Sequence, residues 1–170
     1  MKIALIGTGL MGFPMAERLL ETNHQPIVYN RTRDKAEPLA ELGAEIADSP
    51  LDAIASAGHL LFVATAKPHR HAARIVEHFG MSEFFATVYG SELDGTRGTK
   101  TELLEFAIDR NPGGTRHVMV GDRKHDLIGA VANQMTPVGV AYGYGSVEEL
   151  EGAGAAAIAT SPADLPGILI

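Results

Sequence analysis

The chain has 170 residues, and its 14 lysines and arginines against 21 aspartates and glutamates give a net charge of −7. With 45% hydrophobic and 21% charged residues, the sequence can form a core and is not disordered. The acidic balance argues against a nucleic-acid partner, the apolar runs are too short to span a membrane, and the absence of cysteine excludes disulfides and thiolate zinc sites. We therefore expect a cytoplasmic protein.

Short apolar runs alternate with helical patterns along the whole chain, which is typical of parallel strands connected by helices. Strands are expected at residues 2–6, 25–29, 44–47, 59–64, 85–89, 116–120 and 136–141. Helices are expected at residues 11–21, 33–42, 51–57, 69–79, 99–109, 126–134 and 147–152. The alternation predicts a single α/β domain over residues 1–170, a three-layer, doubly wound, Rossmann-like parallel sheet of about seven strands.

A glycine-rich turn follows the first expected strand and reads G-x-G-x-x-G. In this pattern the first glycine permits a tight turn, the second lets the backbone approach a pyrophosphate, and the third lets helix and strand pack closely. The N–H groups at the start of the next helix would bind the phosphates. A purely structural glycine turn is the alternative. The residues predicted to contact a dinucleotide here are Gly7, Gly9, Leu10, Met11 and Gly12.

The end of the second expected strand indicates which dinucleotide would bind. An NAD site has an acidic residue there, whereas this chain has Asn30, Arg31, Thr32 and Arg33, with no acid before Asp34. The two arginines would attract the 2′-phosphate of NADP, and the asparagine and threonine can add neutral hydrogen bonds. NADP is therefore favoured over NAD, the alternative being two arginines on a solvated loop.

Residues 1–57 resemble the N-terminal segment of the β-hydroxyacid dehydrogenases, the family of 3-hydroxyisobutyrate and 6-phosphogluconate dehydrogenases. The resemblance is carried by Gly7 to Ala16, by Val28-Tyr29-Asn30-Arg31-Thr32 and by Lys35-Ala36. It implies half of a nicotinamide-cofactor site. In that family the catalytic lysine and most of the substrate pocket come from a later helical domain, which this sequence does not contain.

From about residue 58 to residue 155 the sequence is similar to the haloacid dehalogenase superfamily, in its phosphoglycolate-phosphatase-like branch. The matching motifs are Leu61 to Pro68, Gly90 to Asp94, Gly98-Thr99-Lys100 and Val120 to Asp126. The resemblance implies that Thr65 bonds a phosphoryl oxygen, that Lys100 offsets negative charge, and that Asp122 and Asp126 hold Mg²⁺. For the two aspartates, an acidic helix N-terminus without a metal is the alternative.

The same family carries Asp-x-Asp-Gly-Thr at the end of its first strand, where the first aspartate is the nucleophile. Here the first strand is followed by Gly7-Thr8-Gly9, and Asp94-Gly95-Thr96 lies in a different loop, where we expect a turn. We therefore expect no catalytic residues and no efficient catalysis. The histidines are not spaced as a metal set; these are His69, His71, His78, His117 and His125.

The two resemblances meet at a junction near residues 57–58, between a dinucleotide-binding half (1–57) and a phosphatase-core half (58–170). Numbered along the chain, the strand order 5-4-3-2-1-6-7 satisfies both halves, with strand 4 beside strand 1 as the rival. The preferred order would place Thr65 four inter-strand steps of about 4.8 Å from the strand that precedes Asp122, which would separate the phosphatase residues. It would also bring Asp122 and Asp126 towards the dinucleotide site and weaken binding.

These observations lead to one preferred hypothesis and three alternatives. The preferred hypothesis is an engineered, recombined α/β scaffold that binds NADP(H) weakly through its glycine-rich loop and is not an enzyme. The alternatives are a residual Mg²⁺-dependent phosphatase, a natural NADP-binding sensor, and a structural or interaction protein with an empty site. The expected partner is a small-molecule dinucleotide, without nucleic acid or membrane, and the protein is expected to be a monomer or a strand-exchanged dimer.

Overall fold

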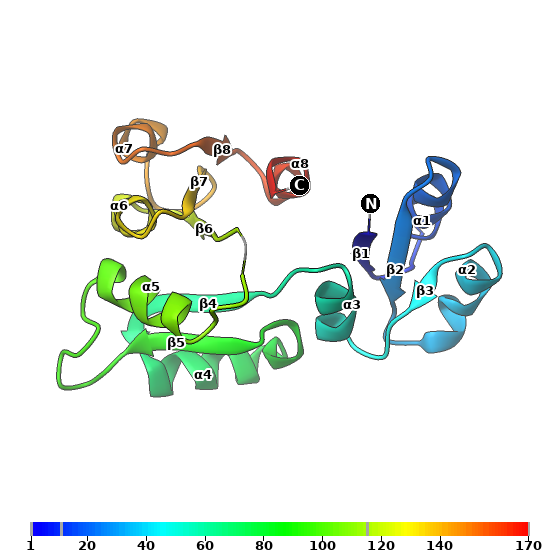
Figure 1. The fold of residues 1–170 in the computed structure, drawn as a ribbon, viewed down its shortest axis with the longest axis horizontal. Helices are drawn as coiled ribbons and strands as arrows, with labels where there is room; N and C mark the ends of the chain where they lie inside the picture. Colours follow the sequence, from blue (N-terminus) through cyan, green and yellow to red (C-terminus); the bar gives the residue numbers. More distant parts are fainter. Residues whose placement is uncertain (1, 11, 115, 170) are drawn as a thin grey trace. The chain divides into compact units, whose positions relative to one another are not determined.

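The computed structural model describes residues 2–10, 12–114 and 116–169 (Figure 1). They divide into two compact units. The first unit contains the residues up to Val63 together with Ala73–Val88, and the second contains Ala64–Ala72 together with the residues from Tyr89 onward. No helix among the described residues combines the length and the hydropathy that a membrane span requires.

The first unit contains a three-stranded sheet in the order β1-β2-β3, formed by β1 (Lys2–Ile6), β2 (Gln25–Tyr29) and β3 (Glu45–Ile46). Both strand pairs are parallel, and Ile6 at the end of β1 lies opposite Tyr29 at the end of β2. The connecting helices are α1 (Gly12–Glu21), η1 (Arg33–Lys35), α2 (Glu37–Glu41) and α3 (Pro50–Ser56). This is the strand order expected for a dinucleotide-binding half.

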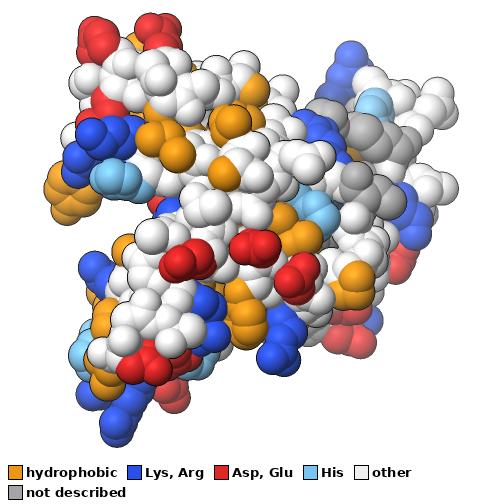
Figure 2. Space-filling model, turned by 60° about the vertical axis from the view of Figure 1, so that its left-hand side comes forward, with side chains coloured by type: hydrophobic (Ala, Val, Ile, Leu, Met, Phe, Trp, Pro, Cys, Tyr) orange, Lys and Arg blue, Asp and Glu red, His pale blue; other side chains and the backbone are white. Residues whose placement is uncertain are grey.

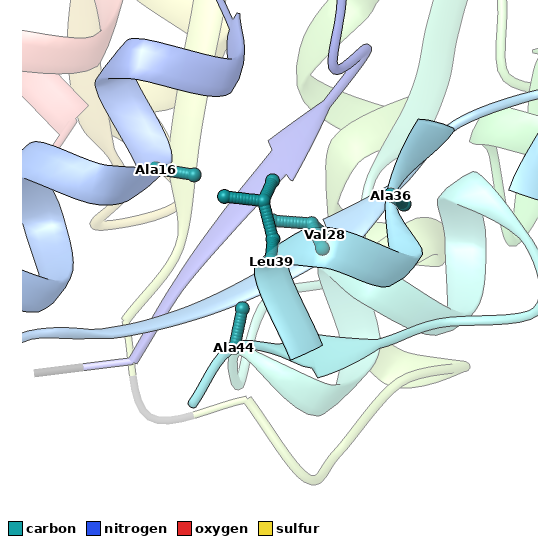
Figure 3. Close-up of a cluster of buried hydrophobic side chains, with 5 residues drawn as sticks. All are labelled: Ala16, Val28, Ala36, Leu39 and Ala44. Atoms are coloured by element: carbon teal, nitrogen blue, oxygen red, sulfur yellow. The ribbon is translucent and has the colours of Figure 1, made fainter. Parts of the chain in front are cut away.

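The core of this unit lies on both faces of β2. Val28 is fully buried and packs in one cluster with side chains from the α1 and α2 regions (Figure 3). The neighbouring Ile27 is also fully buried, in a second cluster that includes Ala53 of α3. Because successive side chains of a strand point to opposite faces, these two residues show that helices cover both faces of β2. The first cluster is Ala16, Val28, Ala36, Leu39 and Ala44.

A two-stranded sheet pairs β4 (Phe62–Pro68) with β5 (Thr87–Ser91). Helix α4 (His69–His78) and the single turn η2 (Ser82–Phe84) lie between them in the sequence. None of the seven residues of β4 is buried. The strongly apolar run at residues 59–64, which predicts a strand buried on both faces, therefore forms a strand that is only half covered.

The second unit contains a parallel sheet in the order β6-β7-β8, formed by β6 (Val118–Gly121), β7 (Thr136–Val140) and β8 (Ala157–Ala159). Its helices are α5 (Lys100–Asp109), α6 (Lys124–Ala132), α7 (Val147–Gly152) and α8 (Leu165–Leu169), with the turn η3 (Pro162–Asp164) before the last. The middle strand β7 is buried from Pro137 to Val140.

The start of α5 is fixed by a capping box. The Thr99 hydroxyl accepts a hydrogen bond from the backbone N–H of Glu102 at 3.2 Å, and the Glu102 carboxylate accepts one from the backbone N–H of Thr99 at 3.2 Å. This reciprocal pair satisfies two backbone donors that the helix itself leaves unpaired. As a result Lys100 is the first residue of the helix, and its position is set by its own local sequence.

The single seven-stranded sheet with the order 5-4-3-2-1-6-7 is not what the structure shows, because the described strands form three small sheets. The neighbours within each half agree with the expected order, which joins strand 1 to 2, 2 to 3, 4 to 5 and 6 to 7. The outermost strand of the first sheet, β3, is only two residues long and offers too few backbone groups to continue a ladder. An eighth strand, β8, extends the third sheet instead.

Candidate functional sites in the two units

In the first unit, the glycine-rich turn connects β1 to α1 in the way that a phosphate-binding turn requires. Gly7 has a φ of +96°, which favours glycine, and its N–H donates to the carbonyl of Tyr29 at 2.8 Å. A Cβ on Gly12 would lie 1.8 Å from the Gly7 carbonyl oxygen, whereas a Cβ on Gly9 would meet nothing within 4 Å. Gly12 is therefore needed for packing, and Gly9 leaves open space where a ligand could approach.

Two polar side chains brace this turn. Thr8 is 4% exposed, its N–H donates to Asn30 Oδ1 at 3.0 Å, and its hydroxyl donates to the carbonyl of Lys35 at 3.2 Å. Asn30 in turn donates through Nδ2 to the carbonyl of Thr32 at 2.8 Å. Sequence reasoning assigned Asn30 to the ligand and passed over Thr8, although the structure uses both side chains to hold the loop. The Thr at the second position of the glycine motif was the only sequence signal for this brace.

The two arginines predicted to select NADP lie in different surroundings. Arg33 forms ion pairs with Asp48 at 2.6 Å and with Glu37 at 3.9 Å. Arg31 is exposed, and in the described part of the chain it has no ion-pair partner. A 2′-phosphate could therefore pair with Arg31 without breaking any ion pair that the structure describes, whereas pairing with Arg33 would compete with Asp48 and Glu37. Of the remaining predicted contacts, Leu10 is 99% exposed, and Met11 lies outside the described residues.

In the second unit, Lys100 connects the middle of β4 to the start of α6. Its Nζ donates to the carbonyl oxygen of Ala64 at 2.7 Å and lies 2.8 Å from Asp126 Oδ1. The two side chains of this ion pair are 9% and 13% exposed. Thr65 follows directly after Ala64, and its hydroxyl oxygen accepts a hydrogen bond from the Lys67 N–H at 3.3 Å. Lys100 thus connects Ala64 of β4 with Asp126 of α6 within one unit.

Glycines make the room that this arrangement needs. A Cβ on Gly129 of α6 would lie 2.8 Å from Lys100 Cγ, so glycine lets α6 pack against that side chain. A Cβ on Gly121 would lie 2.3 Å from the Cβ of Asp126, whose carboxylate also accepts from the Arg123 N–H at 3.3 Å. Both glycines stand where a larger residue would displace the lysine or the aspartate.

Asp122, at the carboxyl end of β6, is held by a glycine-flanked loop. Its carboxylate accepts a hydrogen bond from the Tyr144 N–H at 3.0 Å, and its carbonyl accepts one from the Gly145 N–H at 2.9 Å. A Cβ on Gly143 would lie 2.3 Å from the Cβ of Asp122. The Tyr144 side chain itself is 92% exposed. The loop therefore fixes the carboxylate through backbone contacts and leaves an aromatic ring free beside it.

A second carboxylate stabilises the start of α6 from outside. Glu149 Oε1 accepts from the Lys124 backbone N–H at 2.8 Å and from Arg123 Nε at 2.9 Å. The hydrogen bond from the Lys124 N–H, followed by that from the Arg123 side chain, lowers the pKa of Glu149 below its ordinary value. Glu149 therefore anchors Arg123 and Lys124, which lie in the sequence between Asp122 and Asp126.

The two aspartates of this loop have the carboxylate chemistry that Mg²⁺ prefers. Mg²⁺ in proteins is commonly bound through one or two carboxylates together with water and substrate phosphates. Asp122 and Asp126 supply two carboxylates, and each aspartate side chain packs directly against a glycine. Among the described residues no group of three or more His, Cys, Asp or Glu side chains is close enough to form a metal site by itself. Further oxygen ligands would therefore have to come from the substrate, from water or from another chain.

Comparison with known proteins identifies both parts of the chain. Residues 2–86 match the family model of the NAD-binding domain of 6-phosphogluconate dehydrogenase, and residues 99–165 match that of the HAD-hydrolase-like family. A 5′-nucleotidase of Pseudomonas aeruginosa is 46% identical over 101 residues, which cover 59% of this chain and 46% of the relative. The tyrosine-protein kinase PtkA of Mycobacterium tuberculosis is 36% identical over 153 residues, which cover 86% of this chain and 53% of the kinase.

A solved structure agrees with these sequence relatives. The crystal structure of a Clostridium difficile protein assigned as a phosphatase is 30% identical, has a TM-score of 0.63, and is matched over 82% of this chain and 72% of its own. The chain spans about half the length of the curated relatives it matches.

The expectation that this protein is not an enzyme is contradicted by these relatives, which carry the names of hydrolases. That expectation rested on the missing Asp-x-Asp nucleophile and the missing dehydrogenase catalytic domain, whereas Lys100 is in contact with Ala64 and Asp126 in the structure. The chain therefore belongs to the family of the NAD-binding domain of 6-phosphogluconate dehydrogenase over residues 2–86, and to the HAD-hydrolase-like family over residues 99–165.

Proposed function

We propose that the second unit is the phosphate-handling part of a Mg²⁺-dependent phosphatase that acts on phosphate monoesters. The observation that carries this proposal is the contact of Lys100 with both Ala64 in β4 and Asp126 in α6. A buried ammonium group with carboxylates beside it is the arrangement that a phosphoryl group and its metal ion require. The 5′-nucleotidase relative makes nucleoside monophosphates the first substrates to test.

The Lys100 ammonium group keeps one N–H donor that a substrate can use. A lysine ammonium has three N–H groups, and two of those on Lys100 are directed at Ala64 and Asp126. The third is available to a phosphoryl oxygen, and the 9% exposure of the side chain means that water screens this charge weakly. The hydroxyl of Thr65 can donate a second hydrogen bond. Asp122 and Asp126 would hold Mg²⁺, which would offset the charge on the phosphoryl oxygens. Because the sequence has no Asp-x-Asp nucleophile after its first strand, water would attack the phosphorus, and the alcohol would leave with a proton from that water.

Hydrolysis of p-nitrophenyl phosphate and of AMP, with and without Mg²⁺, tests this proposal. We expect Mg²⁺-dependent turnover that falls about a hundredfold in Lys100→Met, the loss typical of removing one charge-stabilising donor. Asp122→Asn keeps an acceptor for the Tyr144 N–H but removes the charge, so its turnover should lose its response to Mg²⁺. Lys124→Met is the matched control, since the structure uses only the backbone of Lys124. Turnover that is equal in Lys100→Met and Lys124→Met would refute the proposal.

We also propose that the first unit binds NADP(H) at the turn between β1 and α1. The open space at Gly9, next to a helix start that is packed tightly through Gly12, supports this second function. Arg31 favours NADP over NAD because it is exposed and without an ion-pair partner in the described part of the chain. Titration with NADPH and NADH, followed by nicotinamide fluorescence, measures the preference. Equal affinities for the two cofactors would show that Arg31 does not bind the 2′-phosphate.

The junction near residues 57–58 and its origin by engineering stay predictions. So do the cytoplasmic location, the small-molecule partner, and the choice between a monomer and a strand-exchanged dimer. On the face drawn in Figure 2, basic and acidic side chains are interspersed over the surface.

A further inference from the structure

One aromatic side chain of the second unit, that of Tyr144, is not used in the packing of the unit. It is 92% exposed, whereas the next residue, Gly145, is buried. Among the described residues, no ring–ring contact and no cation–π contact involves Tyr144. An aromatic ring contributes to stability when it is buried, so the fold gains little from a ring at this place.

The backbone that carries this ring is fixed to Asp122. The Tyr144 N–H donates to Asp122 Oδ2 at 3.0 Å, and the Gly145 N–H donates to the Asp122 carbonyl at 2.9 Å. A Cβ on Gly143 would lie 2.3 Å from the Cβ of Asp122, and a Cβ on Gly145 would lie 2.3 Å from its carbonyl oxygen. Glycine is therefore required on both sides of Tyr144, and neither neighbour carries a side chain that could cover its ring.

Short contacts connect the ring to the groups proposed to bind phosphate. Asp122, which accepts from the Tyr144 N–H, is followed by Arg123, whose own N–H donates to Asp126 Oδ2 at 3.3 Å. Asp126 Oδ1 lies 2.8 Å from Lys100 Nζ. The Tyr144 side chain thus begins next to a carboxylate of the proposed metal site, within the same unit.

The segment that follows the ring is fixed as well. The Ser146 hydroxyl accepts from the Glu149 N–H at 3.2 Å at the start of α7, and the Glu149 carboxylate accepts from Arg123 Nε at 2.9 Å. The backbone of Tyr144 is therefore held both at Asp122 and at α7. A ring on such a backbone loses little conformational freedom when a ligand stacks on it, because few torsions remain to be ordered.

We propose that Tyr144 is a specificity-determining residue of the phosphatase site, and that its ring stacks on the base of a nucleoside monophosphate. The inference rests on the proposed phosphatase function and names the substrate class of that same site. A phosphate held near Lys100 and Asp122 leaves the ribose and the base extending away from it, and the Tyr144 ring extends from beside the same carboxylate. Every base has a π-face, so stacking favours nucleotides over aliphatic phosphates without selecting one base.

AMP and ribose 5-phosphate test the inference, because both have a ribose 5-phosphate group and only AMP carries a base. We would measure kcat/KM for each with Mg²⁺ in the unmodified chain and in three variants. Tyr144→Leu removes the ring, and Tyr144→Phe keeps it. Tyr142→Leu is the matched control, because this tyrosine is 46% exposed and no hydrogen bond of the described chain joins it to Asp122.

Binding is measured separately from turnover, by calorimetry with the phosphonate analogues of both compounds. In these analogues a methylene group replaces the ester oxygen, so that they cannot be hydrolysed as esters. Thermal melting of each variant shows whether the fold is retained, as the exposure of the Tyr144 ring leads us to expect.

We expect Tyr144→Leu to lower the preference for AMP over ribose 5-phosphate about tenfold, through KM rather than kcat. Tyr144→Phe and Tyr142→Leu should keep the preference of the unmodified chain within about twofold. The affinity for the adenosine phosphonate should fall about tenfold in Tyr144→Leu and should be kept in the other two variants.

The outcomes separate the inference from the function it rests on. Ring-dependent binding of the adenosine phosphonate without any hydrolysis would support the stacking site and refute the phosphatase proposal. Mg²⁺-dependent turnover with the same preference in Tyr144→Leu and Tyr142→Leu would refute the inference and leave the phosphatase proposal in place. Equal losses in Tyr144→Leu and Tyr144→Phe would assign the effect to the hydroxyl group and also overturn the inference. Absence of both binding and turnover would overturn both.

Discussion

Replacing Lys100 by methionine tests the interaction on which the site depends. Methionine has nearly the same length as lysine, so the change removes the ammonium group and leaves most of the packing against Gly129 in place. Two groups lose a partner. The Asp126 carboxylate keeps only the hydrogen bond from the Arg123 N–H, and the Ala64 carbonyl loses the hydrogen bond from Lys100.

The structure sets the expected size of the effect. The side chains of Lys100 and Asp126 are 9% and 13% exposed, which places the pair near the buried limit rather than among surface pairs that contribute about 0–1 kcal/mol. Removing one partner of a buried pair costs about 3–5 kcal/mol, because an uncompensated charge remains. The double variant Lys100→Met, Asp126→Asn carries no such charge, and the asparagine can still accept from the Arg123 N–H. We therefore expect it to be more stable than Lys100→Met alone.

Hydrogen exchange is the suitable assay, because a chain of two compact units need not unfold in one step. A loss of about 3 kcal/mol corresponds to roughly hundredfold faster exchange through opening of α5 and α6. Lys124→Met, whose side chain forms no ion pair in the described part of the chain, should change exchange less than about threefold. If both variants behave alike, or if the double variant is less stable than Lys100→Met, the buried pair does not hold the site together.

Three further predictions concern the rest of the molecule. In Gly12→Ala the new Cβ would lie 1.8 Å from the Gly7 carbonyl oxygen, so the variant should lower the stability of the first unit by about 1–3 kcal/mol and abolish NADPH binding. In Gly9→Ala the new Cβ would meet nothing within 4 Å, so the variant should weaken NADPH binding and leave the melting temperature unchanged. Arg31→Ala should reduce affinity for NADPH but not for NADH in a fluorescence titration, and Arg33→Ala should have the smaller effect because Arg33 is already paired. Glu149→Gln should destabilise the second unit at neutral pH, because hydrogen bonds lower the pKa of Glu149 from its ordinary value of 4.5. In urea titrations, the unmodified protein should be more stable than the variant by the full amount above pH 4.5. This difference should vanish as the pH falls through the lowered pKa.

The features that the sequence predicted well are those encoded over a few neighbouring residues. The strands at 2–6 and 25–29 have the predicted bounds, and the helix expected at 11–21 is found as α1 at Gly12–Glu21. The close packing role of Gly12 follows from the motif itself. The pairing of Thr8 with Asn30 does not, because it joins residues 22 positions apart, and their residue types are equally compatible with a direct contact to a ligand.

The arrangement of the strands could not be obtained in the same way. An apolar run such as Leu60 to Val63 shows what can be buried, but not whether a neighbouring element is present to bury it; Leu60 and Leu61 are 55% and 42% exposed. The strand β8 was missed because its residues Ala157 to Ala159 have weak intrinsic preference for a strand, and their pairing with β7 decides the conformation. Both errors concern contacts between distant segments rather than local preference.

The contact between Lys100 and Asp126 was not predicted, because the distances between the phosphatase residues had been derived from one continuous sheet. In the structure each of these residues is placed by a local feature instead. The capping box of Thr99 fixes the start of α5 and so places Lys100, and Gly121 leaves room for Asp126. The glycine-flanked loop at Tyr144 orients Asp122. Local placement brings Lys100 and Asp126 into an ion pair although the described strands form three separate sheets. The pair therefore does not depend on one continuous sheet.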